Sequence, residues 1–86
     1  MDTVILVTFR VNGLPIKIKI ASESEPSTDQ LYAKIQDIAN VYKINGEIHL
    51  KKVLHEKGNK MYIYHIGENK CVVLVEKLEK IMELDK

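Results

Sequence analysis

The chain begins with two short segments in which apolar and polar residues alternate, and an Asn-Gly dipeptide separates them. Alternation with a period of two indicates β-strands that bury one face. Asn12-Gly13 is typical of a two-residue type I′ hairpin turn, which needs a positive φ at both central positions. The sequence therefore predicts an antiparallel hairpin over residues 3–20, and the rest of the chain must pack against its apolar face.

The turn sets the register of this hairpin. A two-residue turn pairs Val11 with Leu14, so that the apolar residues of the two segments face one another. The predicted pairs are Phe9 with Ile16, Val7 with Ile18, and Ile5 with Ile20. A slip of one residue would place Lys17 and Lys19 on this apolar face, which disfavours the slipped register.

A helix is predicted next, from about Thr28 to Lys43. Ser27 and Gln30 have the spacing of a capping box at its start, and Asn45-Gly46 is a typical end signal. Apolar residues recur at helical spacing and would share one face. They are Leu31, Ile35, Ile38 and Tyr42.

A second hairpin is predicted from residues 47–55 and 60–66, with Glu56–Asn59 as its loop. On one face Ile48 would meet Ile66, Leu50 would meet Tyr64, and Lys52 would meet Tyr62. On the other face Val53 would meet Met61, Lys51 would meet Ile63, and His49 would meet His65. Both faces are partly apolar, so we expect one to cover the helix and the other to meet a partner chain or the C-terminal segment.

The last part of the chain allows two interpretations. Cys71–Val75 is rich in β-forming residues, whereas Glu76–Leu84 favours a helix. One helical face would carry Leu74, Leu78, Ile81 and Met82. Either a fifth strand ends near Lys77 or a second helix covers most of the segment, and periodicity does not decide between them.

The order of hairpin, helix, further strands and last strand resembles the ubiquitin-like β-grasp family. The string Ala33-Lys34-Ile35-Gln36-Asp37 is similar to the helix of ubiquitin, as is its spacing from the first hairpin and from residues 71–77. The resemblance implies an α+β fold, with a mixed sheet of four to five strands and one main helix packed across it. The first and last strands would be parallel neighbours at the sheet centre. The alternative is a ββαββα arrangement with a C-terminal helix.

The resemblance also bears on function. Ubiquitin-like modifiers end in Gly-Gly, whereas this sequence ends Met82-Glu83-Leu84-Asp85-Lys86, so we expect no conjugating or sulfur-carrier activity. What the resemblance then implies is a module that is not conjugated, and such modules mostly bind other proteins.

Composition bounds the classes of function. With 86 residues the chain has room for a single domain, residues 1–86. The 13 basic residues nearly balance the 12 acidic ones, and a net charge of +1 argues against a strongly basic nucleic-acid binder. Cys71 is the only cysteine, which excludes an intramolecular disulfide. With neither a signal-peptide pattern nor an apolar run of roughly 20 residues, we expect a cytoplasmic protein.

Few residues of the sequence suggest metal binding or catalysis. His49 and His65 would share a metal ion only with a third ligand such as His55 or Glu47, and no spacing fixes that ligand. A cysteine that begins an apolar strand, as Cys71 does, is typically a small buried hydrophobe rather than a nucleophile. We therefore expect no metal, no cofactor and no enzyme activity.

The leading hypothesis is a small non-catalytic protein-interaction module. It would bind a protein partner, or a second copy of itself, through an exposed strand edge or the outer face of the second hairpin. The residues of that face are Lys51, Val53, Met61 and Ile63. The alternative is a nucleic-acid-binding accessory protein, with lysines on phosphates and tyrosines stacked on bases. Its residues would be Lys17, Lys19, Lys51, Lys52, Lys57, Lys60, Tyr62 and Tyr64.

Overall fold

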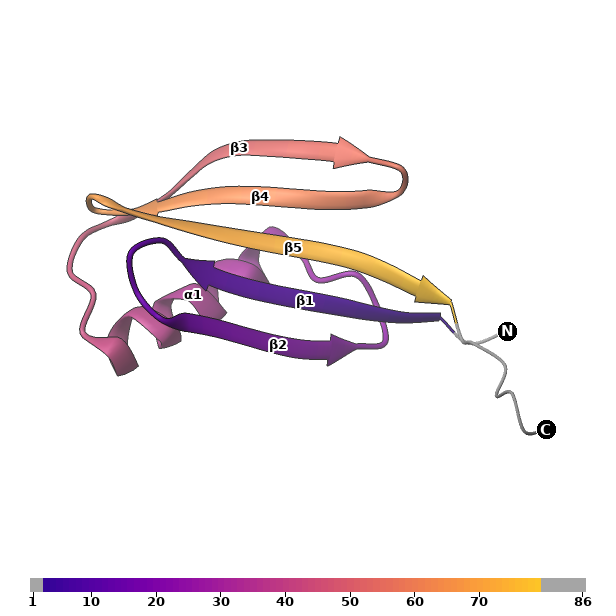
Figure 1. The fold of residues 1–86 in the computed structure, drawn as a ribbon, viewed down its shortest axis with the longest axis horizontal. Helices are drawn as coiled ribbons and strands as arrows, with labels where there is room; N and C mark the ends of the chain where they lie inside the picture. The colour runs from indigo at the N-terminus through magenta and orange to yellow at the C-terminus, as the bar shows by residue number, and fades with distance from the viewer. Residues whose placement is uncertain (1–2, 80–86) are drawn as a thin grey trace.

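The computed structural model describes residues 3–79, and within them a single helix lies against one face of a five-stranded sheet (Figure 1). The predicted α+β class is confirmed. The elements are β1 (Thr3–Val11), β2 (Ile16–Ser22), α1 (Thr28–Tyr42), β3 (Ile48–Glu56), β4 (Asn59–Ile66) and β5 (Asn69–Glu79). In space the strands follow the order β2-β1-β5-β4-β3, and every neighbouring pair is antiparallel.

The first and last strands are neighbours at the sheet centre, but they are antiparallel. The prediction of a mixed sheet with parallel β1 and β5 is therefore wrong. The cause lies in the connections. After α1, the strands β3, β4 and β5 follow one another through tight turns and alternate in direction, so that β5 runs opposite to β1.

The first hairpin forms with a register two residues away from the predicted one. Val11 pairs with Ile16, and Phe9 pairs with Ile18. The connection therefore has four residues, with Gly13 at φ +82° and Pro15 directly before β2. Proline has no backbone N–H to donate to the strand ladder, which accounts for the later beginning of β2. Because the shift is even, the predicted apolar face is kept.

The core lies between α1 and the face of the sheet that it covers. The side chains of Phe9, Ile35 and Val73 are almost completely buried there. The capping box of Ser27 and Gln30 is present, and Lys43 ends the helix in the left-handed region, at φ 56°. Tyr42 was predicted on the buried face, but it is the last helical residue and is 49% exposed.

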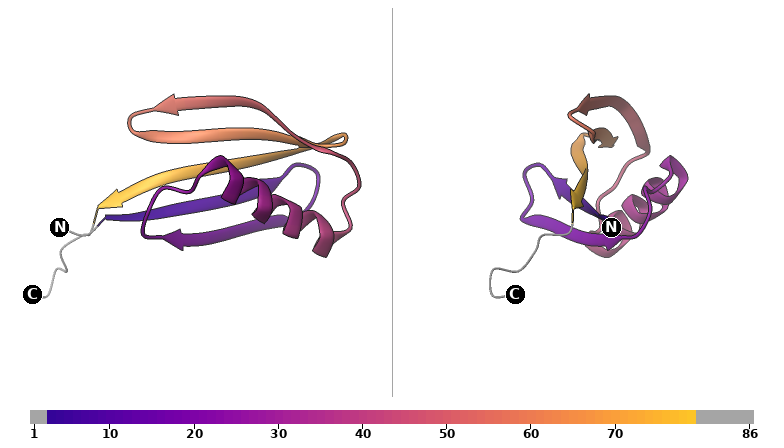
Figure 2. Two further views of the ribbon diagram at one scale, coloured as in Figure 1. Left: turned by 180° about the vertical axis from the view of Figure 1, so that it is seen from behind. Right: turned by 90° about the vertical axis from the view of Figure 1, so that its right-hand side faces the viewer.

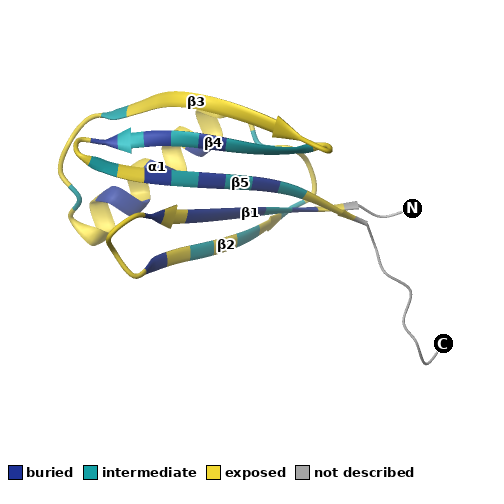
Figure 3. Ribbon diagram, turned by 45° about the horizontal axis from the view of Figure 1, so that its top comes forward, coloured by how far each residue is buried: buried dark blue, intermediate teal, exposed yellow. Residues whose placement is uncertain are grey.

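Helix α1 lies across the β1–β2 side of the sheet, whereas β3 extends beyond it (Figure 2). Leu50 and Val53 consequently remain 42% and 37% exposed, although their pairing with Tyr64 and Tyr62 places them on the helix side. Every residue of β3 after Ile48 is exposed (Figure 3). β3 is therefore an edge strand with little cover on either face.

The second hairpin carries a bulge that the sequence did not predict. Ile48 with Ile66, His49 with His65, and Leu50 with Tyr64 pair as predicted. The register then shifts between Leu50 and Lys52, which leaves Lys51 without a partner in β4. Beyond it the pairs are Lys52 with Ile63, Val53 with Tyr62, and Leu54 with Met61, so the predicted pairs there are wrong.

The bulge adds Lys51 to β3, and the turn that follows is shorter than the predicted loop Glu56–Asn59. Glu56 pairs with Asn59, and the turn is the two residues Lys57 and Gly58, with φ values of 50° and 83°. Positive φ at both positions is the type I′ geometry that we predicted for Asn12-Gly13 instead.

The sequence left open whether the last part of the chain is a strand or a helix, and the structure decides this up to residue 79. Residues 69–79 form one strand, so a helix beginning at Glu76 is wrong. Leu74 and Leu78 thus lie on a strand, and Ile81 and Met82 lie outside the described residues. In the part of the chain that the structure describes, no helix has the length and apolar character needed to cross a membrane.

Candidate interaction face of the sheet

The face of the sheet opposite α1, here called the outer face, bears apolar residues at its centre. The cross-strand pairs form two rows that run from β2 to β3. One row is Lys19–Thr8–Leu74–Met61–Leu54, and the other is Lys17–Arg10–Val72–Ile63–Lys52. The four central residues, here called the apolar strip, are only half-buried. They are Met61, Ile63, Val72 and Leu74.

The apolar strip continues along the sheet. Leu6 is half-buried beside it, while Val4 and Leu78 pair with one another and are 43% and 44% exposed. Soluble proteins seldom leave a contiguous apolar patch open on a sheet unless another surface covers it in use. The outer face is therefore the candidate interaction site.

Basic residues border the apolar strip. Arg10, Lys17 and Lys19, here called the basic flank, are exposed at the β1–β2 side. Lys52 is exposed on the β3 side. The nearest acidic side chains on this face are Glu76, opposite Leu6, and Glu56, opposite Asn59. The face thus has an apolar centre with a mainly positive border.

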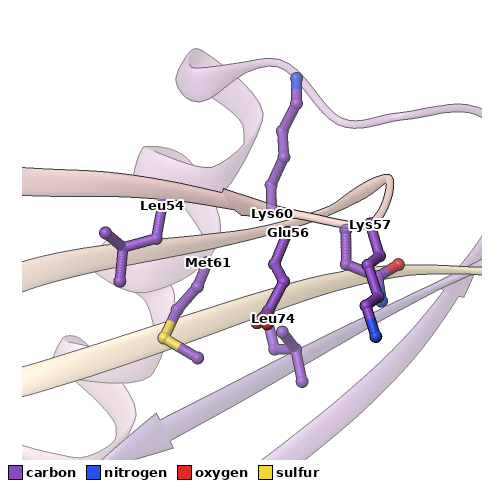
Figure 4. A pocket seen from close by; sticks show the side chains of 7 residues that line it. Leu54, Glu56, Lys57, Lys60, Met61 and Leu74 are labelled. Atoms are coloured by element: carbon purple, nitrogen blue, oxygen red, sulfur yellow. The ribbon is translucent and has the colours of Figure 1, made fainter.

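A shallow depression of about 190 Å³ lies at the β3–β4 end of the outer face. Figure 4 shows Leu54, Met61, Leu74 and Glu56 around it, while Lys60 extends to the other side. Sites for drug-sized ligands usually enclose about 300–1,000 Å³. The depression is therefore better suited to one side chain of a docked protein than to a whole small molecule.

The predicted protein-binding set is divided by the bulge. Met61 and Ile63 belong to the apolar strip, as predicted, but Val53 is opposite Tyr62 on the helix side and Lys51 is the bulge residue. Lys51 and Val53 therefore do not lie beside Met61 and Ile63 on one face. Val72 and Leu74 take their place. Their signal in the sequence is their alternation with Cys71, Val73 and Val75, which are all buried.

The residues that were predicted to bind nucleic acid do not lie together on one surface either. Tyr62 and Tyr64 are on the helix side, 5% and 2% exposed, and stack on each other with ring centroids 6.5 Å apart. Their burial leaves no ring face open to a base, so the stacking role is wrong. Lys60 is engaged in an ion pair with Glu25, and Lys57 lies in the turn. Of the lysines predicted to contact phosphates, Lys17, Lys19 and Lys52 lie on the outer face.

The ion pair of Lys60 has a structural role. It joins the connector before α1 to the start of β4. The hydrogen bond between the two side chains lowers the pKa of Glu25 and raises the pKa of Lys60. The charge of Lys60 is therefore used within the molecule.

The paired histidines do not form a metal site by themselves. His49 and His65 face each other, and His49 Nε2 lies 3.1 Å from Glu47 Oε1. His55 pairs with Lys60, six residues further along the strand. Among the described residues no group of three or more His, Cys, Asp or Glu side chains could hold a metal ion.

The nucleophilic and acidic groups of the core are kept neutral. Burial raises the pKa of the Cys71 thiol to about 11, so the thiolate needed for nucleophilic attack is scarce at neutral pH. Burial also raises the pKa of Tyr64. Both side chains lie on the helix side, away from the outer face.

The free edge of β3 is a second exposed feature of the hairpin. An unpaired strand edge can accept another strand, but a bulge and lysines both discourage such pairing. β3 has the bulge at Lys51 and a second lysine directly after it. The edge is thus less suited to a partner than the outer face is.

Comparison of the chain with protein-family models, with curated proteins and with solved structures found no match. The geometry of the outer face is therefore what bears on function.

Proposed function

We propose that this protein is a small non-catalytic interaction module that binds another protein through the outer face of its sheet. The observation that carries the proposal is the apolar strip of Met61, Ile63, Val72 and Leu74. These residues occupy the centre of the sheet but are only half-buried, and within residues 3–79 the helix covers the opposite face. Covering them would remove apolar surface from water, which favours association.

The same observation supports binding over catalysis. The depression on the outer face is shallow, and Cys71 is a protonated thiol inside the core. A flat apolar surface with a polar border is typical of protein interfaces, whereas active sites are usually concave.

The finer fold assignment, a ubiquitin-like β-grasp module, remains a prediction. The order of hairpin, helix and further strands supports it. The antiparallel pairing of β1 with β5 does not, because the resemblance implied parallel neighbours.

Nucleic-acid binding is the second candidate, and the basic flank favours it. Arg10, Lys17 and Lys19 lie together on β1 and β2, where they are free to contact phosphates. The residues beside them are aliphatic, however, and a sheet that binds single strands usually offers aromatic rings for stacking. The protein partner therefore has the stronger support.

Photo-cross-linking tests the proposal. A benzoylphenylalanine placed at Ile63 should cross-link to protein in a lysate of the source cells, whereas the same group at Val41, 72% exposed on α1, should not. Adding Leu74→Asp to the Ile63 probe should abolish the product. Equal cross-linking from both positions, or a product that nuclease removes, would refute the proposal. A product that joins two copies of this chain would identify self-association.

A further inference from the structure

We propose that the partner surface is an amphipathic helix with acidic borders, supplied by another protein. This inference rests on the proposed function, because it names the chemistry of what covers the outer face. The helix would set its apolar side on the apolar strip and its carboxylates against the basic flank and Lys52.

The spacing of the strands fits a helix. Neighbouring strands lie about 4.8 Å apart, so Arg10 on β1 and Lys52 on β3 are separated by about 14 Å across β5 and β4. An α-helix with its side chains is about 10–12 Å wide. One helix laid along β5 and β4 therefore fills the space between the two positive borders.

The length also fits. The apolar positions of β5 on this face run from Val72 to Leu78, about 20 Å at roughly 3.4 Å a residue. A helix rises 5.4 Å a turn, so about four turns would cover them. Glu76 interrupts the row beside Leu6, and at that point the partner should carry a neutral or basic residue rather than an acidic one.

Charge argues against a second copy of the chain. The basic residues of the outer face outnumber its acidic ones. The basic residues are Arg10, Lys17, Lys19, Lys52 and Lys70, and the acidic ones are Glu56, Glu76 and Glu47, which contacts His49. A symmetric contact between two such faces would bring basic borders together, and like charges at an interface oppose association. The exposed side of α1 does not supply the missing acids either, because Asp29 and Asp37 are interspersed with Lys34. An acidic partner meets neither obstacle.

Selection from a displayed library of helical peptides about 18 residues long tests the inference. Peptides that bind the wild-type protein should combine apolar residues at i, i+3, i+4 and i+7 with Asp or Glu on both borders. Lys19→Glu should weaken their binding about tenfold or more. The matched control Lys34→Glu changes the net charge equally on the exposed side of α1 and should leave binding unchanged.

Substitutions of Leu74 test whether the apolar strip contributes to peptide binding. Leu74→Asp should abolish binding, with circular dichroism to confirm folding. Leu74→Thr, a good strand former, should weaken binding by several-fold if Leu74→Asp proves unfolded. Val41→Asp is the matched control on α1, because it adds the same charge at an exposed apolar residue.

The outcomes separate the two proposals. Peptides that depend on Leu74 but are not acidic, or that bind equally after Lys19→Glu, would overturn the acidic helix and leave the outer face as the site. The recovery of no peptides at all would overturn the helical partner and leave the outer face to be tested by the cross-linking at Ile63. Peptides that bind regardless of Leu74 would overturn the helix and the proposed face together.

Discussion

At the scale of single residues, Tyr64 is the clearest exception to the rule that buried polar groups are hydrogen-bonded. Its hydroxyl is buried without a hydrogen-bond partner among the described residues, and burial raises the pKa of Tyr64. A buried polar group without a partner lowers stability by about 1–3 kcal/mol. The stacked neighbour Tyr62 has no such orphaned hydroxyl, so it serves as the control.

Removing that hydroxyl should stabilise the protein. We expect Tyr64→Phe to raise the free energy of unfolding by about 1 kcal/mol, because the ring keeps its packing and the desolvated hydroxyl disappears. Urea denaturation measures the change. Tyr62→Phe should bring no gain. A loss of stability in Tyr64→Phe would mean that the hydroxyl has a partner, such as a trapped water.

The ion pair of Glu25 and Lys60 gives stability a dependence on pH. The pKa of Glu25 is lowered in the folded state, first by the hydrogen bond from Lys60 and also by the charges of Lys60, Lys77 and His55. Its contribution is therefore fully present above the unfolded pKa of a glutamate and is lost as the pH falls through the lowered value. The raised pKa of Lys60 preserves the pair until strongly alkaline pH.

Glu25→Gln should accordingly lower the melting temperature at pH 7 by a few degrees, a small effect because both side chains remain partly exposed. At a second pH, below the lowered pKa of Glu25, the variant and the wild type should melt together, since the carboxylate is then protonated in both states of the wild type. Differential scanning calorimetry at the two pH values measures this. The conservative change Glu23→Gln in the same connector is the control, because it removes the same charge from an exposed side chain that takes no part in the pair of Glu25 and Lys60.

At the scale of elements, much of the fold could be predicted from local patterns. The capping box of Ser27 and Gln30 begins α1 at the predicted residue, and the alternation of residues 3–20 gives the buried face of the first hairpin. The turns could not be predicted as well. Both Asn12-Gly13 and Lys57-Gly58 offer a glycine, and tertiary contacts help to decide between them. The backbone amide of Asn12 donates a hydrogen bond to the carbonyl of Lys70 in β5, 2.9 Å away.

The bulge at Lys51 explains what was missed at the candidate site. A bulge moves every later side chain of its strand to the opposite face, and no periodic pattern announces it. Val53 therefore lies with Tyr62 rather than with Met61. Val72 and Leu74 were predictable as half of an alternating strand, but only the sheet order shows that they lie beside Met61 and Ile63.

Two connections meet at Gly46 and Gly67, and their close approach should be intolerant of side chains. Gly46 has φ +130°, and a Cβ built there would lie 2.4 Å from the Gly67 backbone. We expect Gly46→Ala to lower the free energy of unfolding by about 3 kcal/mol, from backbone strain and the clash together. Thermal or urea denaturation measures the loss.

Gly13→Ala is the matched control for that loss. Gly13 also has a positive φ, +82°, but a Cβ there would meet nothing within 4 Å. Only the conformational cost of about 1 kcal/mol should remain. Equal losses in the two variants would show that the contact between Gly46 and Gly67 does not contribute.

At the scale of the whole molecule, the two faces of the sheet should differ in what they contribute to folding. Val73 and Leu74 are neighbours on β5, the first fully buried under α1 and the second on the open outer face. We expect Val73→Ala to lower the free energy of unfolding by about 2 kcal/mol, because it leaves a cavity in the core. Leu74→Ala removes more atoms, yet it should cost less than about 1 kcal/mol, because part of that side chain is already in water.

The comparison of these two variants by urea denaturation also tests the open face itself. If Leu74→Ala costs as much as Val73→Ala, another layer already covers the outer face, and the proposal of a free interaction surface fails. A loss that grows with protein concentration would point to a second copy as that layer, because dimer stability follows mass action. A small loss that is independent of concentration means that the apolar strip contributes little to folding, so its value to the protein lies in what it binds.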